Sequence, residues 1–370
     1  MDLGALAHNY GVLTRILAGR AAVMAMVKAD AYGHGAIAVS KELERCGARA
    51  LGVATVEEGM ELREAGVKLP VLVMGGLLGV GSPASSAMVE ANLTPVIHST
   101  GVLDSLDAEA KRAGRRVAVH IKVDTGMSRL GARPEALGPL LDHVGRCKGL
   151  CVEGVMTHLA QADSESESAE QMRIFRQAKK LIEASIGRVP IWHVANSGAL
   201  LRGAPIEVQG AVECWARPGL ALYGEPNGVG LDGVDLRPVM GLESKVVLLK
   251  TIPEGARISY GGTFVTRRPT RIAIVPIGYA DGYPWKASGK AFVLVGGRRC
   301  PVVGRVTMDM IVVDVTDANG VAVNDEVVLL GGQGAGRIGL AEIAGWAGTI
   351  TYEILCGISK RMPRVYVGRA

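Results

Sequence analysis

Residues 21–35 read AAVMAMVKADAYGHG. The first seven of these residues are apolar, and a short apolar run bounded by polar residues is typical of a buried β-strand, predicted here over residues 22–27. Lys28 follows directly where this strand ends. A lysine that leaves a buried strand is desolvated, which lowers its pKa and makes it a candidate for Schiff-base chemistry. The alternative is a lysine whose charged end simply reaches solvent at the rim of the sheet.

The same rhythm, a short apolar run followed by a loop and a longer helical pattern, recurs over about 230 residues. Thr55 and Glu58 form a capping box at the start of one predicted helix, and Gly66 stands where that helix should end. Eight alternating strands favour an α/β fold closed into a (β/α)₈ barrel rather than an open sheet. The strands are predicted at residues 22–27, 50–54, 71–74, 94–98, 117–123, 152–156, 190–194 and 207–216.

The pattern changes in the last third of the chain, where turn residues separate short strands. Residues 331–336, GGQGAG, lack the Lys and the Ser or Thr of a phosphate loop, so we interpret them as a hairpin or connecting loop. We therefore expect the barrel over residues 1–230 and a mostly antiparallel β domain over residues 231–370. Strands are predicted there at residues 246–249, 271–277, 291–295, 310–315 and 326–330, with one helix near residues 340–347.

The composition excludes several classes of protein. Hydrophobic residues make up 48% of the chain and the net charge is only +5, so a disordered chain is excluded. Basic doublets are scattered without interleaved aromatics, which argues against nucleic-acid binding. No apolar run approaches the ~20 residues of a membrane span, and no secretory signal is recognisable. Cys147 and Cys151 lack companions for a zinc site, so we expect no metal and reduced thiols in a cytoplasmic protein.

Polar and cationic residues follow the predicted barrel strands. In a barrel, reactive side chains lie at the carboxyl ends of the strands. A purely structural barrel does not need such a set. The residues at these ends are Lys28, His98, Lys122 with Asp124, His158, Asn196 with Ser197, and Arg217.

Residues 27–35, VKADAYGHG, resemble the pyridoxal-phosphate attachment motif of the alanine racemase family. Other motifs of that family follow in its order and approximate spacing, which makes the resemblance specific. It implies a fold-type III enzyme, a homodimer with shared active sites, that interconverts L- and D-alanine with pyridoxal 5'-phosphate and supplies D-alanine for peptidoglycan. The further motifs are KVDTGMSRLG (122–131), THL (157–159), NS (196–197), RPGLALYG (217–224), ISYGGT (258–263), GYADGY (278–283), GRVTMD (304–309) and TYE (351–353).

The resemblance implies two catalytic bases. Racemisation needs proton donors on both faces of a planar intermediate. Lys28, which also holds the cofactor, takes one face, and Tyr260 of the partner subunit takes the other. His158 and Arg217 would form a chain of hydrogen bonds that leads toward this tyrosine and the cofactor. Arg217 would donate to the pyridine nitrogen without giving up its proton, which should suppress transamination.

The remaining site residues are implied in the same way. The cofactor phosphate would be held by the hydroxyls of Tyr32, Ser197 and Tyr352 and by the backbone N–H groups of Gly219 and Leu220. Arg129 and the backbone amide of Met308 would bind the substrate carboxylate. Lys122 matches a position that many members carry as a carbamylated lysine, whereas a plain ammonium would repel the neighbouring arginine. Tyr279 and Tyr352 would line the entrance, and Asp309 would lie beside Met308 with no assigned role.

Other functions stay open at this stage. A racemase for serine or a broader set of amino acids is the closest alternative; Tyr352 would exclude a hydroxymethyl group, although such discrimination amounts to only ~1–3 kcal/mol. A decarboxylase of the same fold would carry a Cys-bearing motif that is not recognisable here. A non-catalytic pyridoxal-phosphate carrier would end near residue 230 and would lack Tyr260 and Met308.

Overall fold

The computed structural model describes residues 1–75, 82–204, 206–226 and 233–368. These residues form two compact units. The barrel unit comprises Leu6–Ala31 and Gly35–Arg237, and the β unit comprises Met1–Ala5, Tyr32–His34 and Pro238–Ala370. The predicted domain boundary between residues 230 and 231 lies outside the described residues. Among the described helices, none is both long and apolar enough to cross a membrane.

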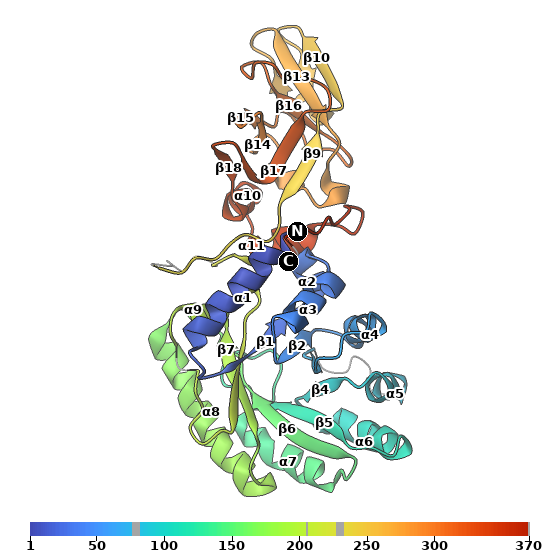
Figure 1. Cartoon of the computed structure of the whole chain (residues 1–370), viewed down its shortest axis with the longest axis vertical. Coiled ribbons are helices and arrows are strands. Elements are labelled where there is room, and N and C mark those ends of the chain that lie inside the picture. The colour runs from blue at the N-terminus through green and yellow to red at the C-terminus, as the bar shows by residue number, and fades with distance from the viewer. Residues whose placement is uncertain (76–81, 205, 227–232, 369–370) are drawn as a thin grey trace. The chain divides into compact units, whose positions relative to one another are not determined.

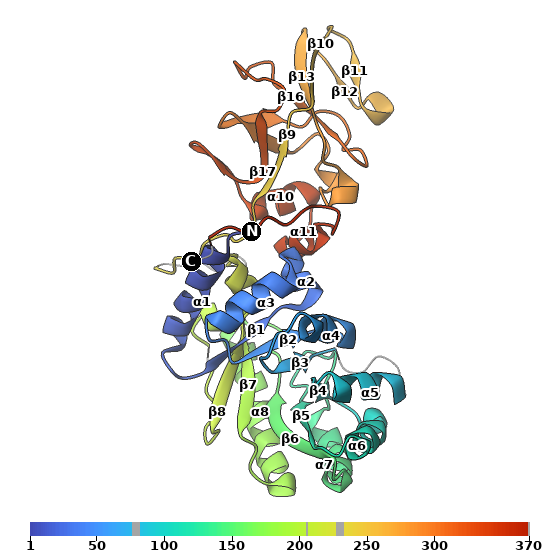
Figure 2. The same ribbon diagram turned by 45° about the vertical axis from the view of Figure 1, so that its right-hand side comes forward.

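The strands of the barrel unit close into a ring, as predicted (Figure 1, Figure 2). Each strand pairs in parallel with the next, and β1 pairs with β8 to complete the barrel. Several strands are buried along their whole length, as expected for a parallel sheet covered on its outer face by helices. The strands are β1 (Ala22–Met26), β2 (Ala50–Val53), β3 (Val71–Val73), β4 (Thr94–Ile97), β5 (Val117–Lys122), β6 (Leu150–Met156), β7 (Ile191–Asn196) and β8 (Glu213–Arg217).

Helices alternate with these strands. The capping box of Thr55 and Glu58 starts α4 as predicted, and Gly66, with a φ of 83°, follows its end. An apolar stripe at spacings of three and four residues faces inward on α7, which is why that helix packs on the barrel. The helices are α1 (Leu3–Leu17), α2 (Lys28–Gly33), α3 (Ala36–Arg45), α4 (Val56–Glu64), α5 (Ser82–Glu90), α6 (Leu103–Arg112), α7 (Leu137–Arg146), α8 (Glu165–Ile186) and α9 (Ser197–Leu201).

Two histidines form a polar contact inside the barrel. His120 of β5 and His193 of β7 are fully buried, with Nδ1 of the first 2.9 Å from Nε2 of the second. Because β5 and β7 are not neighbours, both side chains must point into the barrel. Gly154 of the intervening strand makes room, since a Cβ there would lie 2.3 Å from the His120 ring. Burial lowers the pKa of both histidines, so both are neutral at pH 7, and in the contact between them one ring donates its N–H and the other accepts.

The β unit is mostly antiparallel, as predicted. One sheet has the order β10-β13-β16, and another has the order β15-β14-β17-β18 with β9 paired to β17. The elements are β9 (Leu242–Lys245), β10 (Leu248–Ile252), β11 (Arg257–Ile258), β12 (Phe264–Val265), β13 (Thr270–Val275), β14 (Phe292–Val295), β15 (Arg298–Pro301), β16 (Ile311–Asp314), β17 (Glu326–Gln333), β18 (Gly336–Ile338), α10 (Leu340–Ala347) and α11 (Thr351–Gly357).

Some predicted elements are wrong. The strand predicted at residues 246–249 is interrupted, because Val246 donates to Asp325 in one sheet and Val247 to Ile274 in the other, so the chain changes sheets there. The strand predicted at residues 207–216 is confined to β8, since Gly210 occupies a turn with a φ of 78°. The β unit also contains a second helix, α11, beside the predicted one. The hairpin predicted at residues 331–336 is confirmed as the β17–β18 turn.

Candidate active site

Five predicted site residues lie at one end of the barrel. Lys122 and Arg217 are the last residues of β5 and β8, and Ser197 directly follows β7. Lys28 and His158 each lie two residues beyond the end of β1 and β6. All strands of the ring are parallel, so their carboxyl ends share one rim. The structure therefore brings these side chains to the rim where barrel enzymes carry their chemistry.

The segment after Lys28 has an uncommon backbone. Ala29, Asp30 and Ala31 have φ values of 53°, Tyr32 has 54° and Gly33 has 78°, so α2 turns in the left-handed sense. Non-glycine residues pay roughly 1–2 kcal/mol each in this conformation. Strain of this size persists only where surrounding contacts fix the backbone, and it concentrates at functional sites.

Arg217 is buried and only partly paired. Its Nη2 donates to the carbonyl oxygens of Thr157 at 2.6 Å and Val194 at 2.9 Å, whereas Nη1 has no hydrogen-bond partner among the described residues. Burial lowers the pKa of this guanidinium to about 9, which leaves it protonated at neutral pH. A buried cationic donor without an acceptor is unfavourable, so Nη1 is suited to a ligand atom that accepts a hydrogen bond.

His158 is held neutral beside this arginine. Its Nδ1 lies 3.3 Å from Nη2 of Arg217. Burial first, and then the charges of Arg217 and Lys122, lower the pKa of His158 to about 3. Because a guanidinium can only donate, this contact favours the tautomer in which Nδ1 accepts and Nε2 carries the proton. The residue is a neutral imidazole at neutral pH.

Lys122 stands among like charges. The residue is buried, and burial together with Arg129 and Arg217 lowers the pKa of its amine to about 8. Arg129 itself is exposed. The charged ammonium form is disfavoured in this position, so a larger fraction of Lys122 is the neutral amine than for an ordinary lysine at the same pH.

Backbone donors gather around Ser197. Its Oγ accepts from the N–H of Gly219 at 2.9 Å and from the N–H of Ala221 at 3.3 Å. Gly219 precedes the short 3₁₀ helix Leu220–Tyr223, whose first N–H groups follow the end of β8. Both N–H groups point at Ser197 in this structure, and hydroxyl and amide groups gathered in this way can hold a phosphate without a cationic side chain once they turn toward it. Sequence reasoning missed Ala221, which no polar side chain marks.

The two predicted phosphate tyrosines, Tyr32 and Tyr352, meet within the β unit. Their ring centroids are 6.0 Å apart, with Tyr352 on α11. Burial first, and then Tyr352, raise the pKa of Tyr32, so its hydroxyl keeps its proton and can donate. Gly33 permits the close approach, because a Cβ there would lie 2.2 Å from the carbonyl oxygen of Leu355.

The other predicted residues of the β unit lie on its surface. Tyr260, Met308 and Tyr279 are 71%, 52% and 45% exposed. The loops that carry the last two are joined, because the N–H of Tyr279 donates to Thr307 and that of Ala280 to Met308.

Asp309 is bound by an arginine, Arg361. Its Oδ1 accepts from Nη2 of Arg361 at 2.7 Å, and Nε of the same arginine lies 3.1 Å from Oδ1 of the buried Asp281. Arg361 therefore fastens the loop of Met308 to that of Tyr279. Sequence reasoning missed Arg361, which lies outside the recognised motifs.

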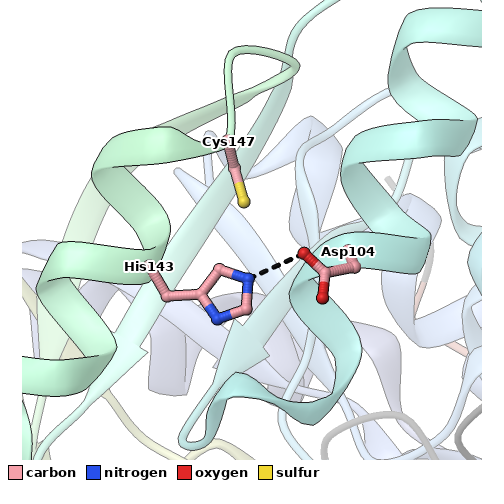
Figure 3. Close-up of side chains that lie close together, drawn as sticks. All are labelled: Asp104, His143 and Cys147. Atoms are coloured by element: carbon pink, nitrogen blue, oxygen red, sulfur yellow. Dashed lines mark hydrogen bonds and ion pairs between the residues drawn. The ribbon is translucent and has the colours of Figure 1, made fainter.

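A separate cluster joins helices α6 and α7 (Figure 3). Nε2 of His143 lies 2.7 Å from Oδ1 of Asp104, and Sγ of Cys147 lies within 4.8 Å of both ligand atoms. Burial first, and then Asp107, raise the pKa of the Cys147 thiol, which disfavours the thiolate that a metal would need. We interpret the cluster as a contact between two helices.

Family models, relatives of known sequence and solved structures that resemble this chain all belong to one family. The model of the alanine racemase N-terminal domain matches residues 1–226, and that of the C-terminal domain matches residues 239–366. The chain is 41% identical to the alanine racemase of Halothermothrix orenii (99% of this chain, 95% of the relative) and 42% identical to that of Sorangium cellulosum (99% and 97%). It is similar to the solved alanine racemases of Streptomyces lavendulae, with a TM-score of 0.90, 35% identity and coverage of 100% and 96%, and of Bacillus anthracis with bound L-Ala-P, with a TM-score of 0.90, 33% identity and coverage of 100% and 95%.

Proposed function

The chain belongs to the alanine racemase family and is an isomerase, and we propose that it interconverts L- and D-alanine by a two-base mechanism that uses pyridoxal 5'-phosphate. The observation that carries this proposal is the buried Arg217 at the rim of the barrel, whose Nη2 contacts the neutral His158 while its Nη1 has no partner among the described residues. The L-Ala-P bound to the Bacillus anthracis relative supports an alanine-like ligand.

The donor set fits this cofactor. When bound, pyridoxal phosphate supplies a carbonyl that condenses with amines and a conjugated ring that spreads the charge of a deprotonated α-carbon. Lys28 would hold it covalently, and Nη1 of Arg217 would donate to its ring nitrogen. The proposed phosphate ligands are the hydroxyls of Ser197, Tyr32 and Tyr352 and the backbone N–H groups of Gly219 and Leu220.

The chain's own residues would move the protons. The amine of Lys28 takes or returns the α-proton on one face of the substrate, and the hydroxyl of Tyr260 from the partner subunit does so on the other face. His158, neutral with its proton on Nε2, can donate toward that tyrosine while Nδ1 accepts from Arg217. Two bases of different kind satisfy the geometric need for proton transfer on opposite faces.

Arg129 would bind the substrate carboxylate, and the backbone amide of Met308 would assist. We propose that Lys122 carries a carbamate: its amine attacks CO₂, a C–N bond forms, and one proton is released. A group with a pKa of about 8 is neutral in roughly a tenth of the molecules at pH 7, which supplies the reacting amine. The added negative charge would then orient Arg129 instead of repelling it. Tyr279 and Tyr352 would narrow the entrance and favour alanine over larger substrates.

The exposed apolar and aromatic side chains on the surface of the β unit support a homodimer with shared active sites. Tyr260 and Met308 are exposed there together with Met310, which is 46% exposed, and a hollow of about 550 Å³ adjoins Tyr260 and Met310. Exposed apolar and aromatic groups of this kind mark interaction surfaces. We propose that a second copy of the chain covers them. The product would serve peptidoglycan synthesis in the cytoplasm.

The absorption spectrum of the purified protein tests this function. With pyridoxal phosphate, a visible band that borohydride removes is expected, and L-alanine should become racemic in a chiral assay. Lys28→Ala should lose both the band and the activity. A borohydride-reducible band that survives in Lys28→Ala would show that another lysine holds the cofactor.

A further inference from the structure

Glu58 connects two loops at the rim of the barrel. It occupies the third position of α4, and its Oε1 accepts from the backbone N–H of Ala29 at 2.7 Å. Its Oε2 accepts from the N–H of Ala54 at 2.6 Å and, at 3.4 Å, from that of Thr55. Ala29 is the residue directly after Lys28, and it lies 29 positions before Glu58 in the chain.

A capping box alone does not require this arrangement. In a capping box the glutamate reaches back only to the N–H of the residue that caps its own helix, here Thr55. That contact is the longest of the three, whereas the two short hydrogen bonds go to Ala29 and Ala54. Hydrogen bonds to an ionised carboxylate are stronger than neutral ones. The carboxylate therefore joins the β1–α2 loop, through Ala29, to the segment just before its own helix, through Ala54.

Hydrogen bonds hold the peptide groups on both sides of Lys28. The carbonyl oxygen of Val27 accepts from the N–H of Ala31 at 2.8 Å, and the N–H of Ala29 donates to Glu58. Ala29 is also the first residue of the left-handed turn, where the backbone is strained. The hydrogen bond from Ala29 to Glu58 restrains the chain where it leaves the strand and so limits displacement of the Lys28 backbone.

We propose that Glu58 is a positioning residue that holds the backbone at Lys28 so that its amine reaches one face of the substrate. The proposal rests on the function proposed for Lys28. A displacement of about 1 Å in a reacting group can cost on the order of 100-fold in rate. Loss of the hydrogen bond from Ala29 to Glu58 should therefore impair proton transfer by Lys28 while the lysine itself remains present.

Four variants separate this role from helix capping and from charge. Glu58→Ala removes all three hydrogen bonds, and Glu58→Gln keeps one oxygen but turns an amide donor toward one of the backbone donors. Thr55→Ala removes the other half of the capping box and leaves the carboxylate in place. Glu57→Gln removes one negative charge from the same first turn at an exposed position.

The measurement is solvent-deuterium exchange into alanine, followed separately on the two faces with the pyridoxal-phosphate-loaded enzyme. The face whose exchange is lost in Tyr260→Phe is the tyrosine face, which identifies the Lys28 face as the other. In Glu58→Ala we expect the borohydride-reducible band to remain and kcat to fall by about 10- to 100-fold, with a smaller change in KM. Exchange on the Lys28 face should slow more than exchange on the tyrosine face. Glu58→Gln should show the same asymmetry to a smaller degree, and Thr55→Ala and Glu57→Gln should behave like the parent enzyme.

Equal slowing on both faces in Glu58→Ala and Glu58→Gln, or a matching change in Thr55→Ala, would reduce Glu58 to a helix cap and overturn the proposal. Unchanged exchange on both faces would overturn it as well. Failure of the underlying function is recognised separately, because Lys28→Ala would then keep the borohydride-reducible band.

Discussion

Nη2 of Arg217 lies 3.3 Å from Nδ1 of His158, and the same nitrogen donates to the carbonyl oxygens of Thr157 and Val194. One nitrogen of the guanidinium is thus committed to the protein, while Nη1 has no partner among the described residues. The arginine is held in place by carbonyl groups at two neighbouring strand ends, and its Nη1 remains able to donate to a ligand.

Replacing this donor should change the outcome of the reaction. In Arg217→Glu, a carboxylate would face the ring nitrogen of the proposed cofactor and keep it protonated, which would favour delocalisation of charge into the ring. We expect a long-wavelength absorbing species with alanine and increased transamination. The measurement is the amount of pyridoxamine phosphate formed per racemisation event. An unchanged spectrum with no pyridoxamine phosphate would contradict the placement of Arg217 at the ring.

The carbamylation proposed for Lys122 can be tested directly. Its amine has a pKa of about 8, so CO₂ should add to it at neutral pH. With ¹³C-bicarbonate, the protein should show a carbamate resonance that is absent in Lys122→Arg and retained in Lys111→Arg, a substitution at a lysine of the α6 surface. Lys122→Arg should also raise KM for alanine several-fold, because Arg129 loses its negative partner. A resonance that persists in Lys122→Arg would assign the carbamate elsewhere.

The buried histidines predict how stability depends on pH. The pKa of His158 is about 3 in the folded chain and about 6.5 when unfolded, so between these values only the unfolded chain binds the proton. The contribution of His158 to the free energy of unfolding should therefore be constant above about pH 7 and decrease as the pH falls, by up to about 2 kcal/mol at pH 5. His120 and His193 act in the same direction. Urea unfolding at pH 7 and pH 5 should show a shallower loss in His158→Gln, and an identical loss would contradict the neutral state of His158.

The left-handed turn after Lys28 has a simple test. Ala29 has a φ of 53°, so glycine relieves strain there, and Ala29→Gly should leave the free energy of unfolding unchanged or raise it by up to about 1 kcal/mol. Ala38→Gly in the ordinary helix α3 is the matched control and should lower it by about 1 kcal/mol. Equal destabilisation in both variants would mean that residue 29 is not left-handed.

The barrel could be predicted because its signal is local. Each strand is a short apolar run, and each helix begins or ends at recognisable capping residues such as Thr55 and Gly66. The change of sheet at Val246 and Val247 could not be predicted, since both residues look like strand interior and only their partners differ. The helix α11 was missed because it is only 7 residues long.

The residues of the candidate site that lie in sequence motifs at strand ends could be predicted. Lys28, Lys122 and Arg217 stand at strand ends, where sequence position alone gives their place on the rim. The left-handed turn was not predictable, because Gly33 is the only residue in it with a preference for positive φ. The tie from Glu58 to Ala29 joins positions far apart in the chain, and the glutamate reads as an ordinary helix cap.

The central claim is that each active site takes Lys28 from one chain and Tyr260 from its partner. In a heterodimer of Lys28→Ala with Tyr260→Ala, one site carries both defects and the other carries neither. Random mixing of equal amounts gives half heterodimers, so about a quarter of all sites should be intact. The measurement is racemisation after the two inactive variants have been mildly dissociated, mixed and reassociated. The account predicts recovery of about a quarter of the parent activity. Activity that stays at the sum of the two variants, with subunit exchange verified, would place both bases on one chain and contradict it.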